Sequence, residues 1–383
     1  MTWRKVKLGA LYEVHNGLSK SRDSFGEGFP FLSYSTVFNN FFLPPTLDSL
    51  VRTNQKEQDS YSIREGDVFI TRTSETSEEL GMSCVALKDY PHATYNGFCK
   101  RLRPITDEVY PRYIGYYLRT SEFRSRFDGL GAAMITRASL RNEDLLSMTV
   151  ALPPMPVQRK IAAVLGAYDD LIENNRRRIA LLEKIARELY RERFMRRAGE
   201  RGQTSINDVC AIQYGYAFNA KMFNASGNGF PIVRIRNIQS GISSDYTTEH
   251  ASSAYVVRNG EVLVGMDGEF HINLWSGGDA YLVQRCCCFR PYDESLKGYL
   301  MEAIRLPIKY FEKSAMGATV GHLGKKDIDT IRVALPTSAE KELFRSVFDE
   351  RLSLSLQNRN LARQRDRLLP RLMSGKINLE KLV

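Results

Sequence analysis

The sequence of 383 residues contains no long hydrophobic run. Its longest apolar stretches, such as Ile161 to Leu165, fall far short of the roughly 20 residues that span a bilayer. The N-terminus, Met1-Thr2-Trp3-Arg4-Lys5, leads into no apolar signal core. These absences predict a cytoplasmic protein without a membrane partner.

Cysteine is present but forms no metal-binding pattern. Cys84, Cys99 and Cys210 are isolated, and Cys286-Cys287-Cys288 is a run. The chain has no C-x-x-C pair and no histidine at the spacing that zinc sites use. We therefore expect no metal site and reduced structural thiols, with alternate members of the run facing opposite sides of a strand.

Several enzyme signatures are also missing. No G-x-x-x-x-G-K-S/T loop occurs, because Gly324-Lys325-Lys326 lacks the first glycine and the hydroxyl residue. There is no G-x-S-x-G elbow, H-E-x-x-H helix, EF-hand loop or G-x-G-x-x-G turn, and no Asn-Pro-Pro-aromatic tetrapeptide. The histidines are scattered singly: His15, His92, His250, His271 and His322. The pattern favours a binding protein without catalytic residues or a cofactor of its own.

The composition is that of an ordinary globular protein, but it is basic. The net charge is +10, with a pI near 9.2, which favours a polyanionic partner. The charge alone is weak support, because many basic proteins bind no nucleic acid. The length predicts two or three domains of about 150 residues each.

The chain contains one long internal repeat. Val150-Ala151-Leu152-Pro153 returns as Val333-Ala334-Leu335-Pro336, a shift of 333 − 150 = 183. The same shift relates these pairs: Thr136 and Thr319, Leu140 and Leu323, Asp144 and Asp327, Asn175 and Asn358, Leu189 and Leu372. Earlier segments match at other shifts: Gly17 with Gly215, Phe29–Leu32 with Phe230–Val233, Arg64–Val68 with Arg258–Val262. Such a period is too long for a solenoid. It predicts two homologous halves with pseudo-twofold character, which suits a partner with two half-sites.

We expect four segments along the chain. Residues 1–152 form a mixed, strand-rich domain, and residues 153–198 form a long helix. Residues 203–335 form a second domain, and residues 337–375 form a second long helix, followed by a short tail to residue 383. A Gly turn precedes a β-rich run in both Ser62–Ile70 and Arg258–Val264. Tyr281–Phe289 reads as a further strand, and Pro111–Phe127 and Lys297–Phe311 read as short amphipathic helices.

The two long helices carry coiled-coil patterns. An a/d seam runs along the first helix over about four heptads: Ile161, Leu165, Tyr168, Ile172, Asn175, Ile179, Leu182, Ala186 and Leu189. The second helix opens with the capping-box spacing Thr337 to Glu340, and Pro370 limits it near its end. Its seam is poorer: Val347, Leu354, Leu361 and Leu368.

Two repeat-equivalent asparagines, Asn175 and Asn358, sit on these seams. Each asparagine is either solvated, or the two form a pair that fixes the register of the helices at some cost in stability. The sequence leaves both readings open.

These features together resemble the specificity subunit of Type I restriction–modification enzymes, over essentially the whole chain. The closest likeness is Val150–Ala162, a Pro-marked strand end that leads into a long helix, although Val157 stands where the family usually has Glu. Leu368–Ile377 is similar to the family's closing L-x-x-L-x-x-G-x-I pattern, and Arg64–Arg72 is similar to a segment of its target recognition domains.

The resemblance implies an α+β fold in which two homologous target recognition domains are separated by an antiparallel pair of long coiled-coil helices, in a pseudo-twofold arrangement. Each domain would read one half of a split double-stranded DNA site, and the helices would set the unread gap. The subunit itself would be non-catalytic. Two modification subunits would carry S-adenosylmethionine and methylate adenine, and restriction subunits would use ATP and Mg²⁺.

The candidate DNA-binding residues follow predicted strand ends, where hydroxyl, amide and basic groups could reach base edges or phosphates. In the first domain they are Ser33, Tyr34, Ser35, Thr71, Arg72, Thr73, Thr136 and Arg137. In the second domain they are Arg234, Arg236, Asn237, Asp267, Gly268, Thr319, His322, Lys325 and Lys326, beside Met266. The alternative interpretation is that an Arg or Thr at a strand end is only solvated and contacts no DNA.

The first long helix offers further candidates. Tyr190, Phe194 and Met195 extend its apolar character past the seam and are candidates for binding a modification subunit. The run Arg176-Arg177-Arg178 suits a solvated face or a subunit contact better than DNA. Two other function classes stay open: a stand-alone nuclease or methyltransferase, and a coiled-coil scaffold or RNA-binding protein without split-site recognition.

Overall fold

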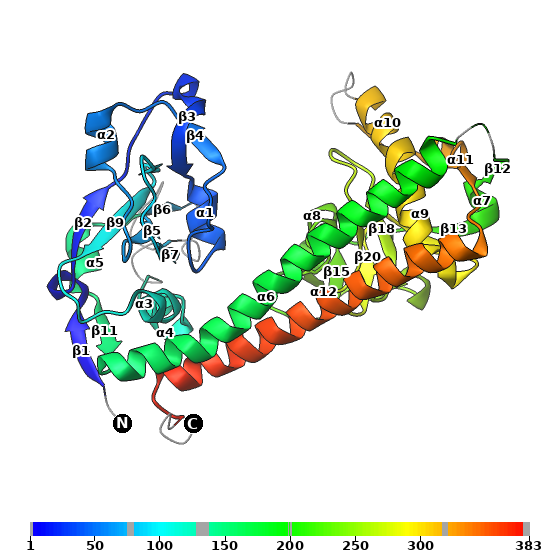
Figure 1. The fold of residues 1–383 in the computed structure, drawn as a ribbon. Coiled ribbons are helices and arrows are strands. Elements are labelled where there is room, and N and C mark those ends of the chain that lie inside the picture. Colours follow the sequence, from blue (N-terminus) through cyan, green and yellow to red (C-terminus); the bar gives the residue numbers. More distant parts are fainter. Residues whose placement is uncertain are drawn as a thin grey trace. The chain divides into compact units, whose positions relative to one another are not determined.

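The computed structural model describes residues 3–74, 80–127, 138–197, 199, 201–315 and 321–377. The chain forms two compact units, Met1–Asp170 with Ala362–Val383, and Leu171–Leu361. Two long helices, α6 (Met155–Tyr190) and α12 (Ser338–Met373), each contribute residues to both units (Figure 1). Each unit therefore consists of one mixed domain and part of the helix pair. No helix in the described part of the chain is long and apolar enough to cross a membrane.

The first domain is built on a four-stranded antiparallel sheet. Its strands, in spatial order, are β2 (Tyr12–Asn16), β9 (Cys99–Pro104), β5 (Val68–Thr71) and β7 (Ser83–Val85). A three-stranded sheet has the order β4 (Ser49–Val51), β3 (Phe25–Leu32) and β8 (Thr94–Tyr95), with β3 parallel to β8. Two short pairs complete the strands: β1 (Arg4–Lys7) with β11 (Thr149–Leu152), and β6 (Thr73–Ser74) with β10 (Ala138–Ser139).

Helices cover this domain and join it to the long helices. They are α1 (Tyr34–Asn39), α2 (Gln55–Ser60), α3 (Pro111–Tyr117), α4 (Ser121–Arg124) and α5 (Asn142–Ser147). The main core packs aromatic residues of α3 against Val68 and Ile70 of β5. Ile161 and Leu165 of α6 and Leu372 of α12 lie in the same core, so the helix ends are anchored by apolar burial.

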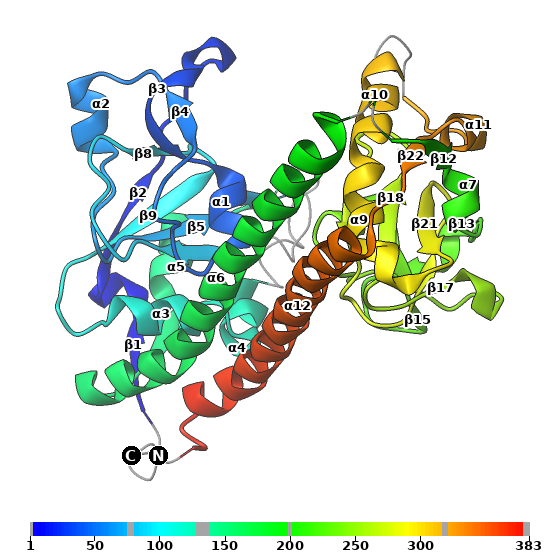
Figure 2. The same cartoon turned by 45° about the vertical axis from the view of Figure 1, so that its right-hand side comes forward.

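The second domain repeats the strand order of the four-stranded sheet. Figure 2 labels several of the strands of the second domain. Its four-stranded sheet has the order β13 (Cys210–Tyr214), β21 (Cys286–Pro291), β18 (Val262–Gly265) and β19 (Ile272–Leu274). The other sheet has the order β14 (Phe223–Asn224), β16 (Tyr246–Thr247), β15 (Phe230–Val233), β20 (Ala280–Leu282) and β17 (Val256–Val257). The strand β12 (Gln203–Ser205) pairs with β22 (Arg332–Ala334). The helices are α7 (Ile206–Val209), α8 (Ile235–Ile238), α9 (Lys297–Ala303), α10 (Arg305–Ala315) and α11 (Lys325–Asp329).

The repeat seen in the sequence is therefore a repeat in three dimensions. The parallel pair β15–β20 corresponds to β3–β8, and the order of the four-stranded sheet is the same in both domains. Gly17 and Gly215 show why their positions match. A Cβ atom would lie 2.0 Å from the backbone oxygen of Asn96 at the first position and 2.1 Å from that of Val283 at the second. Only glycine permits this close approach of two backbones.

The expected strand Tyr281–Phe289 is wrong as a single element. The chain forms β20 and β21, and a turn between them is closed by the Cys286 N–H donating to the Val283 oxygen at 3.1 Å. Arg285 adopts φ +74°, in the left-handed region, at this turn. At this turn the chain passes from the sheet that contains β20 to the sheet that contains β21. An alternation of side chains along the sequence does not reveal such a change of sheet. Each expected amphipathic helix is likewise two short helices in succession, α3 with α4 and α9 with α10.

The three consecutive cysteines alternate as expected. Cys287 packs in the core beneath α9, whereas Cys286 and Cys288 pack in the core between the two sheets. Burial raises the pKa of Cys287 well above its usual value and that of Cys286 to about 12. These thiols are therefore protonated at neutral pH, consistent with a packing role.

The long helices run antiparallel, and polar contacts fix their register. In the second unit, the Asn175 amide donates to Asn358 Oδ1 at 3.0 Å and to Gln357 Oε1 at 2.8 Å. Farther along, Arg351 pairs with Glu183 at 2.7 Å. The residue numbers of these pairs give nearly the same sum, 175 + 358 = 533 and 183 + 351 = 534, as an antiparallel pair requires. The paired reading of the asparagines is therefore confirmed, and Asn175 is only 4% exposed.

In the first unit, Asp169 of α6 pairs with Arg365 of α12, and Tyr116 of α3 donates to the same carboxylate. The sum 169 + 365 = 534 continues the register of the helix pair. The helix α12 continues through Pro370 and ends at Met373, so the proline precedes the end of the helix by one turn.

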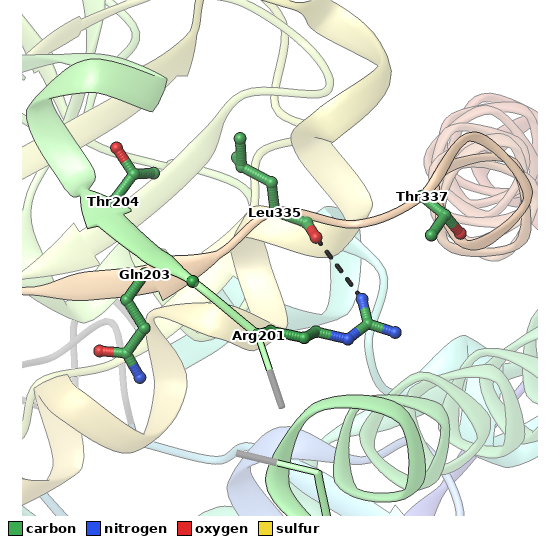
Figure 3. A pocket seen from close by; sticks show the side chains of 6 residues that line it. Arg201, Gln203, Thr204, Leu335 and Thr337 are labelled. Atoms are coloured by element: carbon green, nitrogen blue, oxygen red, sulfur yellow. Dashed lines mark hydrogen bonds between the residues drawn. The ribbon is translucent and has the colours of Figure 1, made fainter. Parts of the chain in front are cut away.

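The start of α12 carries the expected capping box. The Glu340 N–H donates to Thr337 Oγ1 at 3.3 Å, and the Thr337 N–H donates to the Glu340 carboxylate at 2.9 Å. Arg201, which lies beside a shallow hollow with Leu335 and Thr337 (Figure 3), also binds this carboxylate, at 2.7 Å. The bond from Arg201, more than the bonds from Thr337, lowers the pKa of Glu340 to about 2.

We expect Glu340→Gln to destabilise the chain by about 2 kcal/mol at pH 7, since Gln keeps only a neutral acceptor. The carboxylate has a lower pKa when folded than when unfolded, so its contribution is complete above the unfolded value of 4.5 and is lost as the pH falls towards 2. Denaturant unfolding of parent and variant at pH 7 and pH 3 measures this. A difference between the two proteins that does not shrink at pH 3 would contradict the assignment.

Candidate nucleic-acid interface

Two of the predicted clusters in the first domain lie together. Ser33 caps α1, since its Oγ accepts the Thr36 N–H at 3.2 Å, and Ser35 next to it is exposed. The Tyr34 hydroxyl donates to the backbone oxygen of Thr73 at 3.3 Å. The first turn of α1 therefore contacts the segment that follows β5, and hydroxyl groups from both segments gather there.

Thr71 is wrong as a DNA-contacting residue. Its side chain is fully buried, and its Oγ1 accepts the Met82 N–H at 2.9 Å, so it holds the backbone of the domain. Arg72 and Thr73 are partly exposed. The Arg72 N–H donates to the Phe98 oxygen at 2.9 Å, and the Leu140 N–H donates to the Arg72 oxygen at 2.9 Å. The backbone at Arg72 is thus held on both sides.

In the second domain, Asn237 is wrong as an exposed contact. It is 6% exposed, and its Oδ1 accepts the Arg234 N–H at 2.8 Å, so it shapes the start of α8. Arg236 is well exposed but pairs with the buried carboxylate of Asp245. Burial alone would raise the pKa of Asp245, but the bonds from Arg236 and Asn237 lower it. Arg234 lies over the Phe223 ring, with its guanidinium 5.5 Å from the ring centre.

Two further predicted residues of the second domain, Asp267 and His322, are in direct contact. Asp267 Oδ1 lies 2.6 Å from His322 Nδ1, and Arg285 Nε lies 3.3 Å from Asp267 Oδ2. The Gly268 N–H donates to the Gly321 oxygen at 3.1 Å, so the loop after β18 is bound to the segment before α11. Lys325 and Lys326 are exposed at the start of α11.

Sequence reasoning missed Arg285, which is half exposed. It was placed inside a strand, whereas it lies at the turn between β20 and β21. Phe98 stands at the matching turn of the first domain and is 52% exposed. The predicted residues Thr136, Arg137 and Thr319 lie outside the described residues.

The candidate DNA-binding residues of the two domains are held by the same pattern of backbone hydrogen bonds, which we call the backbone frame. The Met266 N–H donates to the Arg285 oxygen and the Leu323 N–H donates to the Met266 oxygen, both at 2.8 Å. These bonds repeat those of Arg72 with Phe98 and Leu140. The frame carries Arg72 and Phe98 in the first domain but Met266 and Arg285 in the second. Equivalent positions therefore display different chemistry.

Of the two predicted partner-binding aromatic residues, Phe194 lies in the core of the second unit and Tyr190 packs against that core. Phe194 is 6% exposed and packs against Tyr299, with ring centres 5.0 Å apart, and the Arg201 guanidinium lies over the Phe194 ring, 4.7 Å from its centre. Tyr190 stacks on Phe194, and burial raises its pKa to about 12. Phe194 is therefore wrong as a docking residue, since residues distant in sequence bury it. Tyr190 is only partly buried, so its contact with a modification subunit stays a prediction. Met195 remains 45% exposed.

The basic run on α6 forms ion pairs at the surface. Arg177 lies 3.1 Å from Glu173, and Arg178 lies 2.6 Å from Glu350 of α12. All three arginines of the run are exposed. Their arrangement is typical of a solvated helix face.

The structure therefore contains a pair of long helices and two homologous domains, and the two domains carry different side chains at equivalent positions. The chain belongs to the family described as "Type I restriction modification DNA specificity domain", whose match covers residues 1–184 and 202–350. The resemblance noted in the sequence is thus confirmed. The function class is that of a Type I restriction–modification specificity subunit, and a scaffold or RNA-binding protein is not favoured.

Individual relatives agree with this membership. The chain is 22% identical over 415 residues to the "Type I restriction enzyme MjaIX specificity subunit" of Methanocaldococcus jannaschii, covering 99% of this chain and 94% of the relative. It is 28% identical over 150 residues to the "Type I restriction enzyme EcoBI specificity subunit" of Escherichia coli, covering 39% of this chain and only 32% of that relative.

A solved structure shares the fold. The crystal structure of a Type-I restriction-modification system S subunit from M. genitalium aligns with a TM-score of 0.54 at 14% identity, covering 97% of this chain and 96% of the other. The expected fold class, α+β with two homologous target recognition domains and long helices, is confirmed.

Proposed function

We propose that this chain reads a split double-stranded DNA site, with one domain for each half-site and the helix pair setting the unread gap. The observation that carries the proposal is the shared backbone frame with unlike side chains, Arg72 and Phe98 in one domain and Met266 and Arg285 in the other. A duplicated reader with two different surfaces suits two different half-sites. The basic net charge supports a polyanionic partner.

The exposed groups supply the chemistry of base and phosphate contacts. Arg285, held by Asp267, can donate two hydrogen bonds to guanine O6 and N7. Hydroxyl groups of Ser33, Tyr34 and Ser35 can contact base edges or phosphates in the first half-site, as can Arg72 and Thr73. In the second half-site, Arg236 and His322 can contact bases, while Lys325 and Lys326 suit phosphates.

We propose further that the chain itself is non-catalytic and acts in the cytoplasm as part of a larger assembly. Two modification subunits would bind S-adenosylmethionine and methylate adenine at the site that this chain selects. Restriction subunits would supply ATP- and Mg²⁺-dependent steps. Met195, exposed at the end of α6, remains a candidate contact for a modification subunit.

Selection of bound duplexes from a random pool tests the proposal. The full chain, assembled with its modification subunits, is expected to enrich one motif with two defined halves and a gap of fixed length. The modification subunits alone provide the control. Enrichment of a single continuous motif, or of no motif, by the complete assembly would contradict split-site reading.

Arg285→Met is expected to relax the preference at one base pair of one half-site. Loss of a bidentate contact removes about 1–3 kcal/mol of discrimination, roughly 5- to 150-fold. The matched control is Arg258→Met, because Arg258 is also an exposed arginine but precedes the first residue of β18. Binding titrations with duplexes altered at single positions measure the preference. An unchanged preference at every position in Arg285→Met would exclude a base contact.

A further inference from the structure

Two cationic side chains lie near one another at one end of the central sheet of the first domain. Lys100 on β9 pairs in register with Asn16 of β2 on one side and with Ile70 of β5 on the other. Arg72 comes two residues after Ile70, so it faces the same side of the sheet. Lys100 is only 4% exposed, whereas Arg72 is partly exposed.

Neither cation has an anionic partner in the described part of the chain. The Lys100 ammonium donates to the neutral amide oxygens of Asn16, at 3.1 Å, and Asn142. The Arg72 Nε is buried and has no hydrogen-bond partner among the residues that the structure describes. Burial, and next the charge of Arg72, lower the pKa of Lys100. Buried charges are normally paired, so two neighbouring cations with no carboxylate partner among the described residues are costly to the fold alone.

The second domain shows that the fold does not need these cations. Cys287 occupies the position of Lys100, since it pairs in register with Tyr214 and Val264 as Lys100 does with Asn16 and Ile70. Met266 occupies the position of Arg72 and is 7% exposed. The same sheet end is therefore filled by neutral side chains in one domain and by two cations in the other. The cations of the first domain thus serve something other than the packing of the sheet.

We propose that Arg72 and Lys100 bind one phosphate group of the DNA backbone beside the half-site read by the first domain, and that the second domain lacks this contact. The inference rests on the proposed function. Arg72, the more exposed group, donates to the phosphate oxygens through its guanidinium. Lys100 lies in the same site, where Asn16 and Asn142 hold its ammonium, and supplies the second positive charge. A phosphate contact positions the domain on DNA but reads no sequence.

The salt dependence of DNA binding tests the site. Arg72→Met and Lys100→Met place at each position an unbranched neutral side chain, which Met266 shows the sheet end can hold. Arg64→Met is the matched control, because Arg64 is exposed and precedes the first residue of β5, whereas Arg72 follows the last residue of that strand. Each full chain is assembled with its modification subunits, and the Kd for the selected duplex is measured from 50 to 200 mM KCl in phosphate-free buffer. Thermal unfolding without DNA verifies that each variant is folded.

Loss of one phosphate contact lowers the steepness of log Kd against log salt by about 0.9. Over a fourfold rise in salt, the parent should therefore lose about 3.5-fold more affinity than Arg72→Met or Lys100→Met. Arg64→Met should follow the parent, and Arg72→Lys, which keeps the charge, should recover most of the steepness. The selected motif should be the same in all variants, because the contact is to phosphate.

Other results would overturn the site. The site would be excluded if the slope of log Kd against log salt were equal in the parent, Arg72→Met and Lys100→Met. It would also be excluded if Arg72→Met changed the selected motif, because that result would assign Arg72 to base reading. If Lys100→Met does not fold, Arg72→Met and Arg72→Lys still decide.

If inorganic phosphate stabilises the parent but not the variants, while their salt slopes agree, the site binds free phosphate instead of DNA. A parent assembly that binds no duplex would overturn both this inference and the proposed function, whereas normal split-site binding with equal slopes would overturn the inference alone.

Discussion

Lengthening both long helices by one heptad is expected to widen the unread gap by about three base pairs while both half-sites stay the same. Seven helical residues add about 10 Å at 1.5 Å per residue, and DNA rises about 3.4 Å per base pair. The insertions are a copy of residues 169–175 after Asn175 and a copy of residues 352–358 after Asn358. Because each copy ends in asparagine and the helices are antiparallel, each native asparagine again faces an asparagine.

Selection from random duplexes, or mapping of methylated sites, measures the new gap. The control inserts the copy after Asn175 alone, which leaves seven residues of α6 without a partner and should destroy the fixed gap. An unchanged gap in the double insertion, or altered half-sites, would show that the helix pair does not act as the spacer.

Gly298→Ala is expected to destabilise the second unit by about 3 kcal/mol, although alanine is the better helix former by about 1 kcal/mol. Gly298 lies in α9, where a Cβ would be 2.2 Å from the backbone oxygen of Phe344 in α12. The two helices would have to separate, which would disturb the core that contains Phe344 and Tyr299. The midpoint of thermal unfolding should fall by roughly 6–12 °C.

Gly166→Ala is the matched control for this prediction. Gly166 lies in α6, and the nearest atom to its Cβ would be the end of the flexible Arg112 side chain, at 2.9 Å. Alanine there should be neutral or slightly stabilising, because the guanidinium can move aside. Calorimetry of the three proteins decides, and equal stability of Gly298→Ala and the parent would contradict the close packing of α9 on α12.

The features that were predictable from the sequence are those with a local or repeated signature. The seam that includes Ile161, Leu165 and Ile172 predicted α6 because burial recurs with the helical period. The duplication was visible in several matched segments, and one matched pair has a clear physical reason: a Cβ at Gly17 or Gly215 would meet a backbone oxygen, which excludes any larger residue.

The features that were missed depend on contacts between distant segments. Tyr190 and Phe194 are apolar at a helix end, and only the packing of Tyr299 reveals that Phe194 belongs to a core and that Tyr190 packs against it. Thr71 ends a buried strand and Asn237 comes shortly after one, as surface residues often do, but both bind backbone groups. The burial of Lys100 depends on the pairing of β9 with β2 and β5, and only the folded arrangement shows that its hydrogen-bond partners among the described residues are the neutral amides of Asn16 and Asn142.

Mapping of N6-methyladenine tests the central claim most directly. The chain is expressed with its modification subunit in a host without DNA methylation, and the genome is sequenced with and without this chain. The account predicts a split motif with a fixed gap that is methylated only when this chain is present. Absence of that motif, with the modification subunit folded and bound to this chain, would contradict DNA reading by the two domains.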